Sequence, residues 1–186
     1  MSVPENVIWR PHPRCRRPHA FWSAPDEQAT EEEVTEMLRA LVRLTKPETV
    51  VETGAYHGRT TAAIASALEL NGAGRVTTYE IDAAAVEIAK ERLEPWTAAG
   101  VVLLVAAAAS ADNLPPFLEL AFLDSCMTCR AGEMLLVWPR LAPGGIVVVH
   151  DAAPGRPPGR VRPPGPHARL DVATPRGLAI FQRAWT

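Results

Sequence analysis

The chain has 186 residues, of which 47% are apolar and 22% carry a charge, and its formal net charge at pH 7 is −2. This length and apolar fraction predict one globular domain over residues 1–186. A net charge so close to zero gives no electrostatic reason to expect binding to nucleic acid or to an anionic membrane, and no apolar run is long enough to span a bilayer.

The first 28 residues are rich in proline and predict an irregular N-terminal segment. They lack the apolar stretch of a secretory signal, so we expect a cytoplasmic protein. Four large apolar side chains are unusual for a solvated tail, and we expect them to pack, either over the core or over a ligand: Ile8, Trp9, Phe21 and Trp22.

Residues Thr30 to Glu33 read Thr-Glu-Glu-Glu, the pattern of a capping box, and predict the start of a helix. We expect this helix to end at Lys46-Pro47 and to lie against a sheet. Its apolar face is expected to consist of Val34, Met37, Leu38, Leu41 and Leu44.

A predicted strand, Thr49–Glu52, stops at the pattern Glu-x-Gly-x-x-x-Gly-x-Thr. Gly54 lets the backbone turn sharply, Gly58 allows close approach, and the following helix start offers free N–H groups. The spacing differs from the Gly-x-Gly-x-x-Gly of NAD and FAD sites and lacks the Lys-Ser/Thr of a P-loop. It resembles the first motif of class I S-adenosylmethionine-dependent methyltransferases. That resemblance implies cofactor contacts by Glu52, Gly54, Ala55, Tyr56, Gly58 and Thr60.

The next predicted elements are a helix over Thr60–Leu70 and a strand over Val76–Glu80. A carboxylate at this second strand tip can accept hydrogen bonds from both hydroxyls of an adenosine ribose, which assigns Glu80 to the cofactor. The resemblance places Ile81 beside the adenine ring. Asp82 is predicted to be the N-cap of a helix over Ala83–Leu93 that ends before Pro95.

A third strand is predicted over Val101–Val105. Relatives carry Gly-Asp after this strand, whereas this chain has a run of alanines followed by Ser110-Ala111-Asp112. Ser110 or Asp112 is therefore the candidate substitute in the adenine pocket, with Ser110 as our assignment.

Two further predicted strands, Leu118–Asp124 and Ile146–His150, end at acids and are separated by a helix from about Arg130 to Leu141. The Leu-x-Pro-Gly-Gly turn before the second strand and the His-Asp pair after it look like the fourth and fifth strands of small-molecule O-methyltransferases, especially the cephalosporin-hydroxylase-like group of natural-product pathways. The resemblance covers residues 50–151.

A final hairpin, Arg169–Val172 with Gly177–Arg183, completes the predicted sheet. We expect an α/β fold, Rossmann-like and doubly wound, with seven mostly parallel strands of which the last is antiparallel. Residues 152–167 carry too much proline for a helix and predict a loop beside the site. Its arginines, Arg156, Arg160 and Arg162, could attract an acidic acceptor, although a solvated linker is the favoured interpretation.

The resemblance implies S-adenosylmethionine as the cofactor and methyl transfer to a small molecule, with a hydroxyl oxygen as the favoured target, in bacterial secondary metabolism. Asp124 is expected beside the cofactor, and Asp124 with Asp151 could bind Mg²⁺, which would lower the pKa of the acceptor. His150 and Asp151 are the candidate bases. Catechol-type enzymes have Asn after the second acid, where this chain has Ala152, so metal dependence stays open.

An alternative is a catalytically silent, methyltransferase-like protein that binds the cofactor or serves a partner. The sequence decides neither this nor whether the chain forms a homodimer. Cys15, Cys126 and Cys129 are odd in number and form no secreted disulfide framework, so reduced thiols are expected, with a zinc or redox role for Cys126 and Cys129 as the minor alternative.

Overall fold

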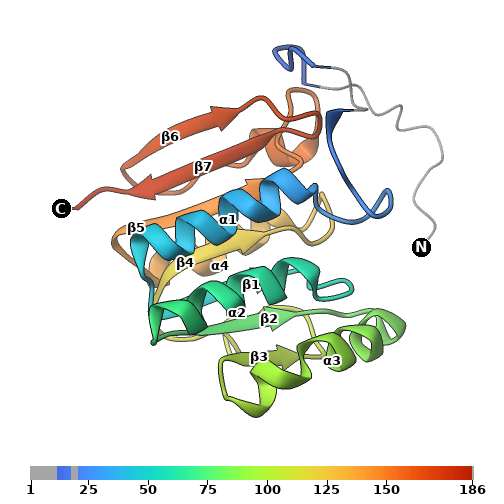
Figure 1. The fold of residues 1–186 in the computed structure, drawn as a ribbon. Helices are drawn as coiled ribbons and strands as arrows, with labels where there is room; N and C mark the ends of the chain where they lie inside the picture. The colour runs from blue at the N-terminus through green and yellow to red at the C-terminus, as the bar shows by residue number, and fades with distance from the viewer. Residues whose placement is uncertain (1–11, 18–20, 186) are drawn as a thin grey trace.

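A computed structural model of the chain describes residues 12–17 and 21–185. Within these residues, seven strands form one sheet in the order β3-β2-β1-β4-β5-β7-β6 (Figure 1). Strands β1 to β5 pair in parallel, β7 is antiparallel to β5, and β6 is antiparallel to β7. The predicted seven-stranded, mostly parallel fold is confirmed. The strands are β1 (Thr49–Thr53), β2 (Arg75–Tyr79), β3 (Val102–Val105), β4 (Leu118–Leu123), β5 (Leu141–His150), β6 (His167–Val172) and β7 (Leu178–Arg183).

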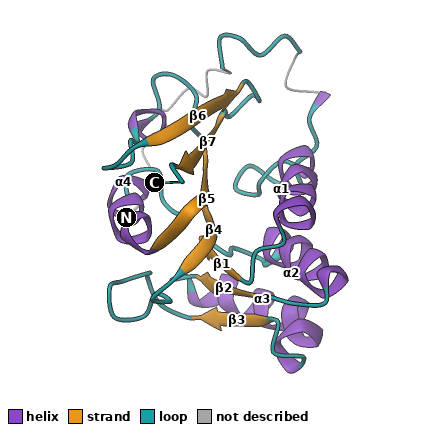
Figure 2. Cartoon of the chain, turned by 90° about the vertical axis from the view of Figure 1, so that its left-hand side faces the viewer, coloured by secondary structure: helices purple, strands orange, loops and turns teal. Residues whose placement is uncertain are grey.

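Helices lie on both faces of the sheet. Helices α1, α2 and α3 cover one face, and α4 lies on the other (Figure 2). Their bounds are α1 (Glu32–Thr45), α2 (Arg59–Asn71), α3 (Ala83–Ala98) and α4 (Arg130–Val137), with two short 3-10 turns, Trp138–Arg140 and Pro157–Arg160. None of the helices in the described part of the chain is long and apolar enough to cross a membrane.

The central strands are apolar on both faces, as parallel strands between two layers require. On β1, Val50 packs in a cluster with Ile64 and Leu68 of α2. Its neighbour Val51 points to the opposite face and packs in a cluster with Leu123 and Met134. The parallel pairing of β1 with β4 sets Thr53 opposite Leu123 and so places the ends of these strands side by side, where the candidate site lies.

The predicted capping box at the start of α1 does not form. The Thr30 hydroxyl donates to Asp124 Oδ2 at 2.6 Å instead of capping the helix, and Glu33 accepts from the Ser23 N–H at 3.2 Å. Leu44, assigned to the apolar face, is 81% exposed. The first turn of α1 is therefore committed to tertiary contacts, which a local pattern cannot reveal.

Two predicted element boundaries differ in the structure. Helix α3 continues past Pro95 to Ala98, because a proline in the last turns removes one N–H bond and the Ala99 N–H still closes the helix on the Pro95 carbonyl at 3.1 Å. Helix α4 ends at Val137 and Leu141 already pairs with Leu118, so β5 starts earlier than predicted. The N-cap prediction is confirmed, since Asp82 accepts from the Ala85 N–H at 2.8 Å.

The N-terminal segment and the proline-rich loop differ in part from expectation. Ile8 and Trp9 lie outside the described residues; Phe21 is 65% exposed, so its predicted packing is wrong, whereas Trp22 is partly buried. The loop over residues 152–167 contains a 3-10 turn and packs firmly, with Val161 buried. Arg156 is also buried, so the interpretation as a solvated linker is wrong there.

Candidate functional site

The glycine loop between β1 and α2 has the left-handed backbone that its sequence predicts. Gly54 has φ +82° and Gly58 has φ +74°. A Cβ on Gly54 would lie 2.6 Å from the Asp124 carbonyl oxygen, and one on Gly58 would lie 3.1 Å from the Leu93 side chain. Close packing against the Asp124 backbone therefore requires Gly54, whereas the positive φ is the main reason for a glycine at position 58.

The loop is tied to the end of β2. The N–H groups of Gly54 and Ala55 donate to the Tyr79 carbonyl at 2.9 and 3.1 Å. The Tyr56 N–H donates to Glu80 Oε2 at 2.7 Å, and Glu80 Oε1 accepts from the Ile81 N–H at 2.8 Å. The structure thus brings the predicted loop and the predicted ribose carboxylate together.

The predicted cofactor residues differ in their exposure to solvent. Ile81 is 76% exposed, and Glu80, Tyr56 and Ser110 are partly exposed. The backbone N–H of Ser110 donates to Asn113 Oδ1 at 2.7 Å, in the connection that follows β3. Ala55, Gly58 and Thr60 are buried within the loop and the helix start.

Glu52 lies beneath the loop and has no exposed surface. Its Oε2 accepts from the hydroxyls of Thr61 on α2 and, at 2.7 Å, Thr78 on β2, while Oε1 has no hydrogen-bond partner. Burial raises the pKa of this carboxyl to about 7, against the two hydroxyl hydrogen bonds, which lower it. Glu52 thus supports the loop by accepting hydrogen bonds from both α2 and β2 beneath it.

The acids predicted at the tips of β4 and β5 do lie together. One ligand atom from each of Asp124, His150 and Asp151 falls within 4.8 Å of the others. The guanidinium of Arg130 bridges the two acids, at 2.8 Å from Asp124 and 3.0 Å from Asp151. Asp151 is also paired with Arg176 at 2.8 Å. Because cations of the protein already occupy these carboxylates, the residues do not fit a bound Mg²⁺.

His150 and Asp151 are not placed to act as bases, which corrects the prediction. His150 is 0% exposed, with Nδ1 2.9 Å from Asp124 Oδ1 and Nε2 2.6 Å from Glu31 Oε2. Burial lowers its pKa, but the Asp124 charge and the hydrogen bonds to Asp124 and Glu31 outweigh that effect and raise it to about 9. A protonated imidazole with both nitrogens engaged cannot accept a proton.

Asp151 is equally unavailable to an acceptor. It is 1% exposed, and although burial opposes ionisation, the charges of His150, Arg176 and Arg130 hold its pKa far below the usual range. A carboxylate this strongly stabilised is a weak base. The His-Asp pair is therefore a buried ionic support for the site.

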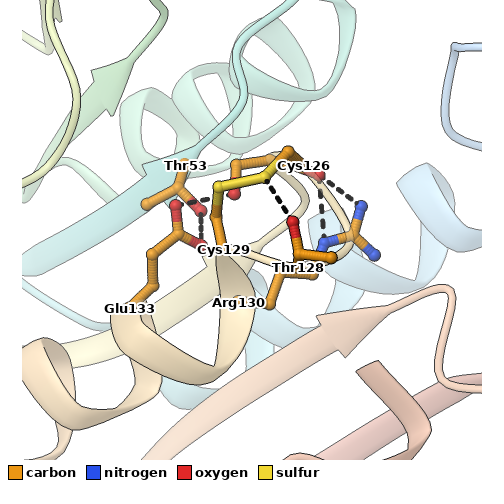
Figure 3. Close-up of a disulfide and its surroundings, with 7 residues drawn as sticks. Thr53, Cys126, Thr128, Cys129, Arg130 and Glu133 are labelled. Carbon is orange, nitrogen blue, oxygen red and sulfur yellow. Dashed lines mark hydrogen bonds between the residues drawn. A yellow bond between two sulfur atoms is a disulfide. The ribbon is translucent and has the colours of Figure 1, made fainter. Parts of the chain in front are cut away.

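A second carboxylate, which the sequence did not suggest, lies beside Ser125, the residue that follows Asp124. Glu133, in the first turn of α4, points toward Thr53 (Figure 3) and accepts from its hydroxyl at 2.9 Å and from the Ser125 hydroxyl at 2.6 Å. Burial raises the pKa of Glu133, opposed by these two hydrogen bonds and by Arg130. A partly exposed carboxylate with a raised pKa can accept a proton.

Cys126 and Cys129 form a disulfide in the loop between β4 and α4 (Figure 3), so the expectation of reduced thiols is wrong for this pair. Cys15 is free. The Cys129 N–H donates to the Cys126 carbonyl at 2.9 Å, which closes the turn that leads into Arg130. The two-residue spacing was the only sequence signal for this bond.

A family profile described as "Methyltransferase domain" matches residues 51–152. No curated protein matches the sequence. Among solved structures, the O-methyltransferase TomG from Streptomyces achromogenes, involved in tomaymycin synthesis and solved with SAM, is 18% identical, with a TM-score of 0.68 over 85% of this chain and 82% of its own. An O-methyltransferase from Bacillus cereus in complex with SAH is 15% identical, with a TM-score of 0.71 over 85% and 84%. The SAH-bound methyltransferase PaMTH1 from Podospora anserina is 18% identical, with a TM-score of 0.69 over 93% and 84%.

Proposed function

We propose that this chain, which belongs to the methyltransferase-domain family, transfers a methyl group from S-adenosylmethionine to a hydroxyl oxygen of a small molecule in bacterial secondary metabolism. The observation that carries the proposal is the junction of the glycine loop with the end of β2. There the Glu80 carboxylate accepts from the Tyr56 N–H at 2.7 Å, beside an Ile81 side chain that is 76% exposed.

The residues at this junction fit the parts of the cofactor. Glu80 Oε2, which accepts from the Tyr56 N–H, has a lone pair left for a ribose hydroxyl, whereas Oε1 already accepts from the N–H groups of Ile81 and Asp82. Ile81 offers an apolar surface to the purine, and Ser110 lies in the connection after β3, which is bonded to β2 through the Glu80 N–H and the Val105 carbonyl at 3.1 Å. When bound, S-adenosylmethionine supplies a methyl group activated on its sulfonium sulfur.

The acceptor end of the site would lie at the tips of β1 and β4. Asp124 has an 8% exposed side chain there and is held by Thr30, His150 and Arg130. A hydroxyl acceptor must lose its proton during transfer. We place the proton acceptor at Glu133, whose Oε1 is 2.6 Å from the Ser125 hydroxyl, in the role that the sequence assigned to His150 and Asp151.

The cytoplasmic location stays a prediction. The Cys126–Cys129 disulfide argues against a strongly reducing compartment, because cytosolic thiols are normally kept reduced.

The test of the proposal is calorimetric titration with S-adenosylhomocysteine of the wild type, an Ile81→Arg variant and a Leu70→Arg control. Leu70 is 58% exposed near the far end of α2, so both substitutions alter one open aliphatic side chain. We expect wild type and control to bind alike, and Ile81→Arg to bind about tenfold more weakly through lost apolar contact with the purine. Equal binding by all three variants would remove Ile81 from the site.

Turnover with a panel of phenols and other hydroxyl compounds then separates the enzyme from the silent alternative, which shares the binding result. Failure of the wild type to bind S-adenosylhomocysteine would reject the proposed cofactor. A Gly54→Val variant is not informative, because its Cβ would collide with the Asp124 backbone whether or not a cofactor binds.

A further inference from the structure

The space between the tips of β4 and β5, where the sequence left open a divalent cation, is filled by a side chain of the protein. Arg130 Nη2 donates to Asp124 Oδ1 at 2.8 Å, and Arg130 Nη1 donates to Asp151 Oδ2 at 3.0 Å. Arg130 is 2% exposed. A planar guanidinium with fixed donors can bridge two carboxylates as a metal ion does.

The remaining carboxylate oxygens also have donors. Asp124 Oδ2 accepts from the Thr30 hydroxyl at 2.6 Å. Asp151 accepts from Arg176 on both oxygens, at 2.8 and 2.9 Å, and from Arg156. A divalent cation would have to displace several charge-assisted hydrogen bonds to reach either acid.

The arginines alone neutralise the acids of the cluster without a metal ion, and the protonated His150 leaves an excess of positive charge. Three arginines, Arg130, Arg156 and Arg176, face three acids, Glu31, Asp124 and Asp151, and His150 adds positive charge when it is protonated. All of these residues lie close to the two strand tips, with side chains that are at most 11% exposed. Two further positive charges would be repelled by the arginines in an environment that screens charge poorly.

Arg130 is held in place by the loop that precedes it. It is the first residue of α4, directly after the turn closed by the Cys126–Cys129 disulfide (Figure 3). Its Nε and Nη2 donate to the Ser125 carbonyl at 3.1 and 2.7 Å. The guanidinium is thus anchored to the backbone next to Asp124 as well as to the two acids.

We infer that Arg130 is the resident cation of this site, holding Asp124 and Asp151 together in place of a divalent metal, so that the protein neither binds nor needs a metal ion there. The part that concerns methyl transfer rests on the proposed function. It implies an acceptor that is oriented without chelation, which favours an isolated hydroxyl over a catechol. Cation binding itself can be measured without any turnover.

The experiment uses Mn²⁺ as the probe, followed by electron paramagnetic resonance of the free ion and by thermal melting. The proteins are the wild type, Arg130→Ala, Arg130→Ala with Asp151→Asn, and Arg39→Ala, which removes an exposed arginine of α1 as a control. We expect no saturable Mn²⁺ binding by the wild type or by Arg39→Ala at millimolar concentrations. Treatment of the wild type with EDTA should leave its melting temperature unchanged.

Arg130→Ala should melt at a lower temperature, gain saturable Mn²⁺ binding at least about tenfold tighter than any wild-type binding, and recover part of its melting temperature with Mn²⁺. The double variant should lose that gain. Saturable Mn²⁺ binding by the wild type would overturn the inference, and so would a folded Arg130→Ala that binds no Mn²⁺. If Arg130→Ala does not fold, Arg130→Gln, which removes the charge but keeps amide donors, takes its place in the same comparison.

Discussion

Glu52→Gln is the substitution whose effect can be worked out most fully from the contacts. Glu52 has 0% exposure, one hydrogen-bonded oxygen and one oxygen without a partner. Burial raises its pKa from 4.5 to about 7, against the hydrogen bonds from Thr61 and Thr78. Glutamine has the shape of the protonated acid, and its carbonyl oxygen can accept from the same two hydroxyls.

The sign of the effect follows from linkage between proton binding and folding. Below pH 4.5 the carboxyl is protonated in both the folded and the unfolded chain, so there is no cost. As the pH rises, the unfolded chain ionises first and the folded state loses stability until the pH exceeds the folded pKa. At about 1.36 kcal/mol per pKa unit, the full cost is about 3 kcal/mol, most of which develops between roughly pH 5 and pH 8.5.

The assay is urea unfolding of the wild type, Glu52→Gln and the exposed control Glu36→Gln at both pH values. We expect the free energy of unfolding of Glu52→Gln, relative to that of the wild type, to rise by about 2 to 3 kcal/mol from the lower pH to the higher. Glu36→Gln should follow the wild type. If the free energies of unfolding of Glu52→Gln and the wild type changed equally with pH, the pKa of Glu52 would not be raised by burial. The assignment of Glu52 as a buried support beneath the glycine loop would then be wrong.

Two predictions concern proton positions in the site. Because Asp124 and Glu31 outweigh the effect of burial and raise the pKa of His150 to about 9, its imidazole should show no titration midpoint between about pH 6 and 8 in an NMR titration; a midpoint near the ordinary value of 6.5 would contradict the ionic assignment. Glu133→Gln should leave S-adenosylhomocysteine affinity within about twofold of the wild type but lower kcat on a hydroxyl acceptor by about 10²–10⁴ if Glu133 takes the proton. An unchanged kcat would remove Glu133 from that role.

The fold was predictable because its signals are local. Apolar strands that stop at Glu52, Glu80 and Asp124 and the turn residues that follow them recur in one order, and each signal needs only a few neighbouring residues. Residues far apart in sequence broke the local rules. Thr30 does not cap α1 as its local sequence predicts, because its hydroxyl donates to Asp124, 94 residues away.

The acids at the tips of β4 and β5 were also predictable, because neighbouring parallel strands end at the same edge of a sheet. Their chemical state was not. Three arginines contact Asp151 from separate parts of the chain: Arg130 at a helix start, Arg156 in the proline-rich loop and Arg176 in the turn before β7. Their spacing in the sequence does not predict that they meet.

By itself, the sequence determined the order of strands and helices, the glycine loop and the positions of the carboxylates, since all of these depend on backbone preferences and on the periodicity of apolar residues. The tertiary structure decided which charges face one another. Burial and the distances between charges set the protonation of Glu52 and His150. The fold places the Arg130 guanidinium between Asp124 and Asp151 and leaves the Glu133 side chain partly exposed. Electrostatic energies depend on separation in space and on exclusion of water, and neither quantity can be predicted from the order of residues along the chain.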